Sequence, residues 1–459
     1  MTTSALIPHE RRSRPIVVRR KPRRASVELA MSGALLAAVM LVLRPGIALA
    51  GLTAGLLLAA RLVAARGLRM RRRIRTGSRR GLRRRGRASP LQRSVAIATT
   101  AAAATVLLAL FSYGAALTAR SNSSLGIRSV EWLRGNGAAW LVSDIERLYY
   151  SVNAPSKGGP TLKRLPSVGV GSEPAGRLRP QVAEVQRPKA ITPVIRPALS
   201  SEGSWHATQS RYASQPDPPV LVTTYRPDPS YPRVLAGVAR IDPRRATVAL
   251  YPGIQEPPGG VASGLPSDVP AGSRKRILAT FNSGFKPSDA SAGFFAGGHL
   301  LEPMRPGLAT LVGTRSGKVD VVSWSGGQRP GGDVAFARQN LPLIVNHGQP
   351  NPNLSDGPEW GTTVGNSTMV WRSAVGVDRH GDLLYAAADY RTVRGLADIL
   401  IHAGAVRAME LDINSYWVTF NTYGNPGAAH PKKLLVGMDR PAQRYLTPDD
   451  RDFFAVFAR

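Results

Sequence analysis

The stretch Trp371–Asn421 reads WRSAVGVDRHGDLLYAAADYRTVRGLADILIHAGAVRAMELDINSYWVTFN. Its first part alternates small and apolar residues around the polar turn Asp378–Asp382, a pattern typical of a β-hairpin. Its second part spaces apolar residues between positions 396 and 403 as on one face of a helix, and Gly404 stands where helices commonly end. A strand is predicted next, over Val406–Leu411. The stretch therefore predicts a hairpin, a helix and a strand in this order.

The predicted strand delivers three polar side chains, Glu410, Asp412 and Asn414. Residues two apart on a strand point to the same face of the sheet. Polar groups therefore gather at a strand end that follows a helix, which is a common place for a site. The alternative is that these residues only cap the strand and start the next turn.

Composition bounds the chemistry of the 459-residue chain. It has no cysteine, which excludes disulfides, thiolate nucleophiles and cysteine-based metal sites. The net charge of +32 is unevenly spread, because residues 1–120 hold 24 Lys and Arg residues against only Glu10 and Glu28. Nucleic-acid binding by the whole chain is therefore a poor inference from the charge.

The N-terminal quarter is predicted to be a membrane anchor with three spans. A span takes about 20 apolar residues, and the uncharged run Val95–Ala119 meets this, while Ala25–Leu43 and Gly46–Ala60 are shorter and suit a helical hairpin. Basic blocks flank the runs, and the positive-inside rule places them in the cytoplasm. The alternative is a signal peptide cut after Ala50. The predicted parts are a basic tail (1–24), a hairpin (25–60), a basic cytoplasmic loop (61–94) and a third span (95–119).

This arrangement predicts a multi-pass protein of the cell membrane whose C-terminal domain is extracytoplasmic. The basic loop has two interpretations: contact with anionic lipid headgroups, or binding of an acidic partner or nucleic acid. No aromatic residues interleave its arginines, so membrane lipids are the expected partner and nucleic acid is not.

Beyond the anchor, a juxtamembrane helical segment (120–153) and a Pro-rich, partly disordered linker (154–204) are predicted to lead into a domain over 205–459. This domain is predicted to be α+β, with most strands in its first half. The expected strands are Val220–Tyr225, Val234–Ile241, Ala246–Tyr251, Ile277–Asn282, Ala309–Thr314 and Val319–Trp324.

Further polar residues stand beside buried runs. Asn282 ends the strand Ile277–Asn282, where its amide can face a ligand. Arg338 and Asn340 precede the apolar run Leu343–Val345. Arg372, next to Ser373, opens the hairpin, and its guanidinium is suited to a bidentate phosphate contact; alternatively it is a surface arginine on a strand.

Five motifs in order carry a resemblance. They read ILATFNSGF, GFFAGG, RQNLPL, WRSAVGVDRHGDL and GLADILIHAGAVRAMELD. Together, over roughly Pro219–Phe457, they resemble the phosphodiester glycosidase family. The resemblance implies an α+β, mixed-sheet domain, here preceded by the N-terminal transmembrane region. It also implies hydrolysis of a glycosidic bond to a phosphodiester, which leaves a phosphate monoester.

Carried over residue by residue, the resemblance matches Asn282, Arg372, Gly376 and Asp412 to family motifs. The chain departs from the family at the glycine-rich end of the site. Glu410 stands where the family usually has Asn, and glycines are replaced at the positions Ser283, Ile413 and Asn414. The substrate is therefore expected to differ.

The expected function is hydrolysis of sugar-phosphodiester linkages in envelope polymers, with the polymer as partner. The alternatives are a non-catalytic polymer-binding module on the same fold and a scaffold that acts through its basic loop. No cofactor is expected, because the histidines lack metal-ligand spacing, although a divalent cation beside the phosphate stays open. The predicted catalytic residues are Asp412, Glu410 and Arg372, and the predicted substrate-binding residues are Asn282, Asn340, Arg338, Asn414 and Ser373.

Overall fold

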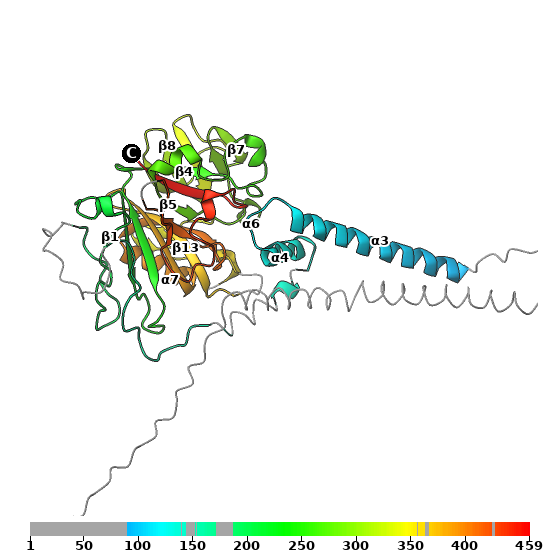
Figure 1. Ribbon diagram of the computed structural model, residues 1–459, viewed down its shortest axis with the longest axis horizontal. Coiled ribbons are helices and arrows are strands. Elements are labelled where there is room, and N and C mark those ends of the chain that lie inside the picture. Colours follow the sequence, from blue (N-terminus) through cyan, green and yellow to red (C-terminus); the bar gives the residue numbers. More distant parts are fainter. Residues whose placement is uncertain are drawn as a thin grey trace, which may run out of the picture. The chain divides into compact units, whose positions relative to one another are not determined.

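The computed structural model in Figure 1 describes residues 90–138, 140–143, 152, 154–170, 187–355, 357–362, 367–424 and 427–459. The chain divides into two compact units. One contains the helix α3 (Pro90–Thr118) and residues 124–132, and the other contains residues 119–123 and 133–459. The second unit holds the candidate site.

The largest sheet of this unit, sheet A, has the strand order β1-β2-β3-β14-β13-β15-β11-β12, and its neighbouring strands are antiparallel. The hairpin, helix and strand predicted over 371–421 are confirmed as β13, β14, α7 and β15. The bounds are β1 His206–Ala207, β2 Val220–Tyr225, β3 Ala236–Ile241, β11 Val345–Asn346, β12 Gln349–Pro350, β13 Val370–Asp378, β14 Leu383–Arg391, α7 Val393–His402 and β15 Ala405–Ile413.

Helix α7 owes its position to its ends and its apolar face. The hydroxyl of the N-cap residue Thr392 accepts a hydrogen bond from Gly395 N at 3.2 Å. Gly404, with φ +99°, takes the left-handed conformation that follows the helix. Leu396 and Leu400 are fully buried and pack with sheet A residues in one apolar cluster, and Figure 1 shows α7 beside β13. The helix therefore covers one face of sheet A.

Two further sheets lie in the same unit. Sheet B has the order β17-β16-β5-β18-β4, sheet C has the order β7-β6-β10-β8-β9, and the strand pairs in both are antiparallel. The bounds are β4 Ala246–Tyr251, β5 Ile277–Asn282, β6 Phe294–Ala296, β7 His299–Glu302, β8 Ala309–Thr314, β9 Val319–Ser323, β10 Val334–Gln339, β16 Phe420–Thr422, β17 Lys432–Lys433 and β18 Phe453–Ala458.

The main core lies where the three sheets meet. It joins Val375 and Leu411 of sheet A, Phe281 and Phe454 of sheet B, and Phe336 of sheet C. Because strand side chains alternate between faces, Met409 and Leu411 in this core leave Glu410, which stands between them, on the other face of β15. The register of β13 with β15 shifts between the pairs Ala374–Glu410 and Arg372–Ile413, so the alternation does not extend to Asp412. The predicted α+β domain is thus present.

Short helices connect these elements. They are α6 Pro287–Ala290, η1 Ser210–Tyr212, η2 Val261–Ser263, η3 Ala271–Arg276, η4 Pro358–Trp360 and η5 Arg444–Leu446. Part of the segment predicted as a linker packs on the domain: Ile191 and Glu202 are buried, and the Glu202 carboxylate binds the buried Arg226 guanidinium at 2.7 Å.

The N-terminal prediction requires a correction. No helix within the described residues is long and apolar enough to cross a membrane, so the transmembrane region in the predicted fold class and the multi-pass, three-span localisation are not supported. A span needs about 20 apolar residues. The part of α3 with described side chains, 104–118, is shorter and includes polar Ser112 and Tyr113. The predicted tail, the hairpin over 25–60 and the basic loop up to residue 89 lie outside the described residues.

Helix α4 (Leu125–Gly135) lies within the predicted juxtamembrane helical segment and ends just before Asn136-Gly137. Its side chains bind polar groups of α3. The Tyr113 hydroxyl and the Ser129 hydroxyl are 2.8 Å apart, and Trp132 Nε1 donates to Ser112 Oγ at 3.0 Å. Ser112 and Tyr113 of α3 are thus hydrogen-bonded to side chains of α4.

Candidate functional site

Two carboxylates at the end of β15 form the centre of the candidate site. Glu410 is fully buried, and its Oε1 accepts a hydrogen bond from Arg372 Nη1 at 2.5 Å. Asp412 keeps 11% of its side chain exposed, and its Oδ2 lies 2.8 Å from Arg451 Nη2. Its Oδ1 accepts from Ile413 N at 3.0 Å. Each acid therefore has one arginine partner, and Asp412 is the more accessible of the two.

Arg372 lies beside Glu410, as predicted, but all the hydrogen bonds of its guanidinium are made to groups of the protein itself. Besides Glu410, Nη1 donates to Trp360 O at 2.8 Å, and Nη2 donates to Gly361 O at 2.9 Å and Thr368 O at 2.8 Å. Nε donates to Arg391 O at 2.9 Å. An arginine has five N–H groups, and all five are accounted for. Arg372 thus fastens the backbone at Trp360, Gly361 and Thr368 to the end of the sheet.

Asn282 and Ser373 hold the backbone of Asp412. The Asn282 amide donates to Ser373 Oγ at 2.9 Å, and Ser373 Oγ donates to Asp412 O at 2.7 Å. Asn282 Oδ1 accepts from the Tyr385 hydroxyl and from Thr419 N, both at 3.0 Å. Asn282, Ser373 and Asp412, which were all predicted as site residues, therefore lie together. Asn282 and Ser373 hold the backbone of Asp412 in position.

Of the remaining predicted residues, Asn340 lies at the site and Arg338 is committed elsewhere. Asn340 Nδ2 donates to the backbone oxygen of Glu410 at 2.7 Å. Arg338 is fully buried, and its Nε binds Asp452 Oδ2 at 2.7 Å while Nη2 donates to Phe285 O at 2.5 Å. The Arg338 side chain thus holds the loop after β5 in place.

Asn414 stabilises the turn that follows β15. Its φ of +79° is in the left-handed region, which asparagine tolerates better than most residues. Its Oδ1 accepts from Tyr416 N at 3.0 Å, which closes the turn. An asparagine can therefore stand where the family has a glycine without a change of backbone path.

Three buried polar atoms near the acids have no hydrogen-bond partner within the described part of the chain. They are Glu410 Oε2, Asn340 Oδ1 and Ser283 Oγ. The backbone connects their residues, because Asn340 binds Glu410 O and Asp412 N donates to Ser283 O at 2.9 Å. Buried polar atoms in folded proteins are normally satisfied. These atoms are thus suited to hold a water molecule or a ligand hydroxyl.

The electrostatics of the two acids fit proton transfer. Burial raises the pKa of Glu410 to about 7, against the attraction of Arg372 and with a small further rise from Asp412. Burial also raises the pKa of Asp412 to about 6, against the attraction of Arg451, and Asp452 adds to the rise. Acids with raised pKa values in a shared site are typical of general acid–base catalysis.

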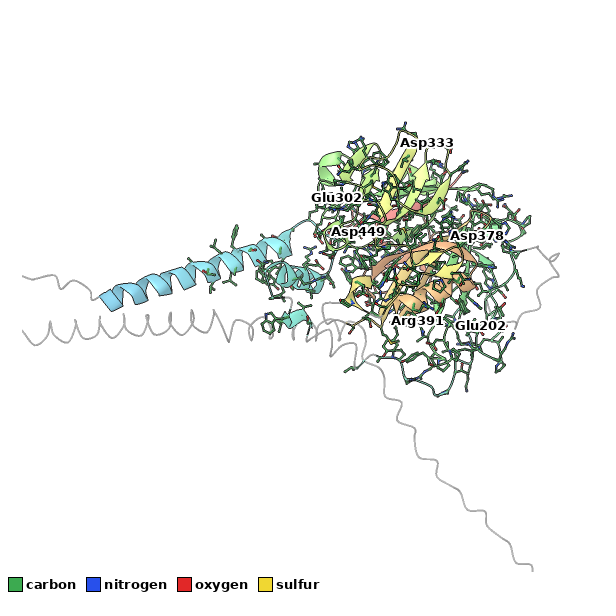
Figure 2. The ribbon with its side chains drawn as sticks, turned by 180° about the vertical axis from the view of Figure 1, so that it is seen from behind. Glu202, Glu302, Asp333, Asp378, Arg391 and Asp449 are labelled. Carbon is green, nitrogen blue, oxygen red and sulfur yellow. The ribbon has the colours of Figure 1, made fainter. Side chains whose placement is uncertain are left out.

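Sequence reasoning missed the residues around Asp412 that follow β15. The Arg451 guanidinium lies 4.9 Å from the Trp417 ring centroid, and that of Arg444 lies 5.4 Å from the same centroid. Arg444 pairs with Asp449, which is labelled in Figure 2. The charged run Asp449–Asp452 directly before an apolar strand was the available signal, since β18 pairs with β5 and Phe453 lies opposite Asn282.

No three His, Asp or Glu side chains in the described ranges lie close enough together to hold a metal ion. A small pocket on the surface is lined by Pro188, Asp242, Arg240 and Asp382, among others, and shares no residue with the candidate site.

Comparison with known protein families gives one match. Residues 276–412 match the phosphodiester glycosidase family. The matched segment begins at η3 and ends at Asp412, so it contains both acids of β15. The family resemblance seen in the sequence is confirmed for this segment, while Trp417, Arg444 and Arg451 lie beyond it.

Two solved structures are similar at low identity. One is the catalytic domain of zebrafish N-acetylglucosamine-1-phosphodiester alpha-N-acetylglucosaminidase, auto-inhibited by its pro-peptide, at 15% identity over 53% of this chain and 84% of that chain, with a TM-score of 0.36. The other is a hypothetical protein from Synechocystis, at 13% identity over 52% of this chain and 62% of that chain, with a TM-score of 0.31. Curated proteins show no match.

Proposed function

We propose that this protein is a glycoside hydrolase that cleaves the bond between a sugar and a phosphodiester. The observation that carries the proposal is the pair Glu410 and Asp412, buried acids with raised pKa values inside the segment that matches the phosphodiester glycosidase family. Water adds to the anomeric carbon, the bond from that carbon to the phosphate oxygen breaks, and the leaving group departs as a phosphate monoester. The proposed substrates include polymers whose units are joined through such sugar-phosphate diesters.

Asp412 is the acid we assign to the reacting centre, because its carboxylate is the more exposed of the two. It acts as nucleophile or as the base that takes a proton from water. A phosphate monoester is a good leaving group, so strong acid assistance is less necessary than for an alkoxide. Glu410 lies two residues before Asp412 on β15, and the charge of Asp412 adds to the raised pKa of Glu410.

A second candidate function is binding without turnover. Ile413, which stands where the family has a glycine, is buried in an apolar cluster with Phe285 and Val370. This side chain fills space at the end of β15 that a glycine would leave open. A site narrowed in this way is suited to hold a sugar phosphate without hydrolysing it.

The first prediction concerns Asp412→Asn. The full chain, incubated with a methyl diester of N-acetylglucosamine 1-phosphate, should convert the diester into a monoester, which ³¹P NMR detects directly. Asp412→Asn should lower this rate by about a hundredfold or more, because it removes the carboxylate and keeps the shape of the side chain.

Asp398→Asn is the matched control, because this carboxylate is exposed on α7. Equal rates for Asp412→Asn and the wild type would reject the assignment of Asp412. Binding of the diester without any conversion by the wild type would favour the non-catalytic alternative.

A further inference from the structure

We propose that Arg451 is the residue that binds the phosphate of the substrate, an inference that rests on the proposed function. Phosphate recognition was predicted for Arg372, but the five N–H groups of Arg372 donate to Glu410 and to four backbone oxygens. A ligand could bind Arg372 only by breaking the hydrogen bonds that Arg372 donates to Trp360 O, Gly361 O and Thr368 O. Binding of the substrate phosphate therefore requires another positively charged side chain near Glu410 and Asp412.

Arg451 has the position that the chemistry needs. Its Nη2 lies 2.8 Å from Asp412 Oδ2, so its guanidinium is within reach of any group that contacts this carboxylate. The same nitrogen donates to Gly284 O at 3.2 Å, in the loop after β5. Its side chain is 7% exposed, whereas the Arg338 side chain is fully buried. Of these two arginines, Arg451 is therefore the more accessible.

Two neighbouring acids, Asp449 and Asp452, are paired with other arginines. Asp449 pairs with Arg444 through both carboxylate oxygens, at 2.7 and 2.9 Å, and also contacts Arg440 at 3.3 Å. Asp452 pairs with Arg338 at 2.7 Å. Arginines 338 and 444 are thus neutralised inside the fold.

The aromatic side chain of Trp417 orients the Arg451 guanidinium. The distance from the guanidinium carbon to the ring centroid is 4.9 Å, and Trp417 itself is partly exposed. An arginine held against an aromatic ring keeps its planar fork in one orientation, which suits two oxygens of a phosphate. A lysine at this position would supply the positive charge but not the planar pair of N–H donors that an arginine has.

The test compares a charged and a neutral substrate. With Arg451→Lys and Arg451→Met, the KM for the methyl diester of N-acetylglucosamine 1-phosphate should rise about ten- to hundredfold, the loss expected for a charged hydrogen bond. The KM for a neutral aryl glycoside of the same sugar should stay unchanged, and Arg451→Lys should lose less than Arg451→Met. Arg394→Met, an exposed arginine on α7, is the control.

Titration with inorganic phosphate gives a readout that does not depend on turnover. Phosphate should bind the wild type and bind Arg451→Lys at least about tenfold more weakly, with circular dichroism used to show that the variant is folded. If the wild type hydrolyses the diester and both Arg451 variants keep its KM, the role of Arg451 is refuted and the proposed function stands. If the wild type fails to hydrolyse the diester, the proposed function fails, and the phosphate affinities alone decide the role of Arg451.

Discussion

At the scale of single residues, the two acids of β15 show how burial overrides a nearby positive charge. Glu410 contacts Arg372 at 2.5 Å, which favours the ionised carboxylate, yet its complete burial raises its pKa to about 7. Asp412 is less enclosed, and its pKa rises to about 6. The acids therefore gain protons in the pH range in which enzymes commonly work.

The raised pKa of Glu410 predicts a pH dependence of stability. Its ordinary value is 4.5 and its folded value is about 7, so between these values the folded protein holds a proton that the unfolded chain has lost. The free energy of unfolding should therefore fall as the pH rises through this window, by an amount on the order of 1 kcal/mol per unit of pKa difference.

Glu410→Gln should flatten this part of the curve, measured by urea unfolding at a series of pH values. A slope that is the same in Glu410→Gln and in the wild type would show that Glu410 does not hold the proton.

Sequence reasoning found which residues meet but not what they do there. Asn282, Ser373, Asp412 and Glu410 were predicted as site residues; hydrogen bonds join the first three, and Glu410 stands two residues before Asp412 on β15. The partners of Arg372 could not be predicted from the sequence, because they include the backbone oxygens of Trp360 and Gly361. Hydrogen bonds to backbone oxygens leave no residue-type signal in the sequence.

At the scale of elements, the antiparallel pair β13 and β15 carries the site. Gly376 on β13 lies opposite Ala408, two residues before Glu410. A Cβ atom at Gly376 would lie 2.7 Å from Arg407 O and 3.0 Å from Ala408 Cβ. The backbone of the two strands can approach this closely only with a glycine here.

Gly376→Ala should therefore lower the free energy of unfolding by about 1–3 kcal/mol, the usual cost of overpacking. Diester hydrolysis should fall as well, because β15 has to shift and it holds both acids. Urea unfolding and the ³¹P assay measure the two effects. Gly272→Ala is the control, since no atom lies within 4 Å of its added Cβ. Wild-type stability in Gly376→Ala would mean that the strands can separate without cost.

Strands and helix were predictable at this scale because each has a strong local pattern. The strands Val220–Tyr225, Ala246–Tyr251, Ile277–Asn282 and Ala309–Thr314 were predicted with the bounds that the structure has. The order of strands within sheets A, B and C was not, because it depends on pairing between segments far apart in sequence, such as β18 with β4 and β5. Local periodicity carries no information on such partners.

At the scale of the whole molecule, segments distant in sequence complete the domain. Residues 119–123 belong to the same compact unit as residues 133–459. Asn122 Nδ2 donates to Asp449 Oδ2 at 2.9 Å, and Arg440 Nη2 donates to Asn122 Oδ1 at 2.7 Å. The apolar composition before residue 119 had led to the prediction of a membrane span. The composition gave no sign that the residues after it bind Arg440 and Asp449 near the C-terminus.

The two bonds of Asn122 predict that the domain depends on a residue more than 300 positions before its partners. Asn122→Ala leaves buried Asp449 and Arg440 each without one polar contact, and hydrogen bonds to charged groups contribute about 1.5–3 kcal/mol each. We therefore expect the free energy of unfolding of the full chain to fall by about 2 kcal/mol or more. Asn353→Ala, an exposed asparagine, should change it by less than about 0.5 kcal/mol. Equal stabilities of the two variants would mean that the segment 119–123 rests on the domain without supporting it, whereas the expected difference makes these residues part of the folded unit that holds Arg451 and Asp412.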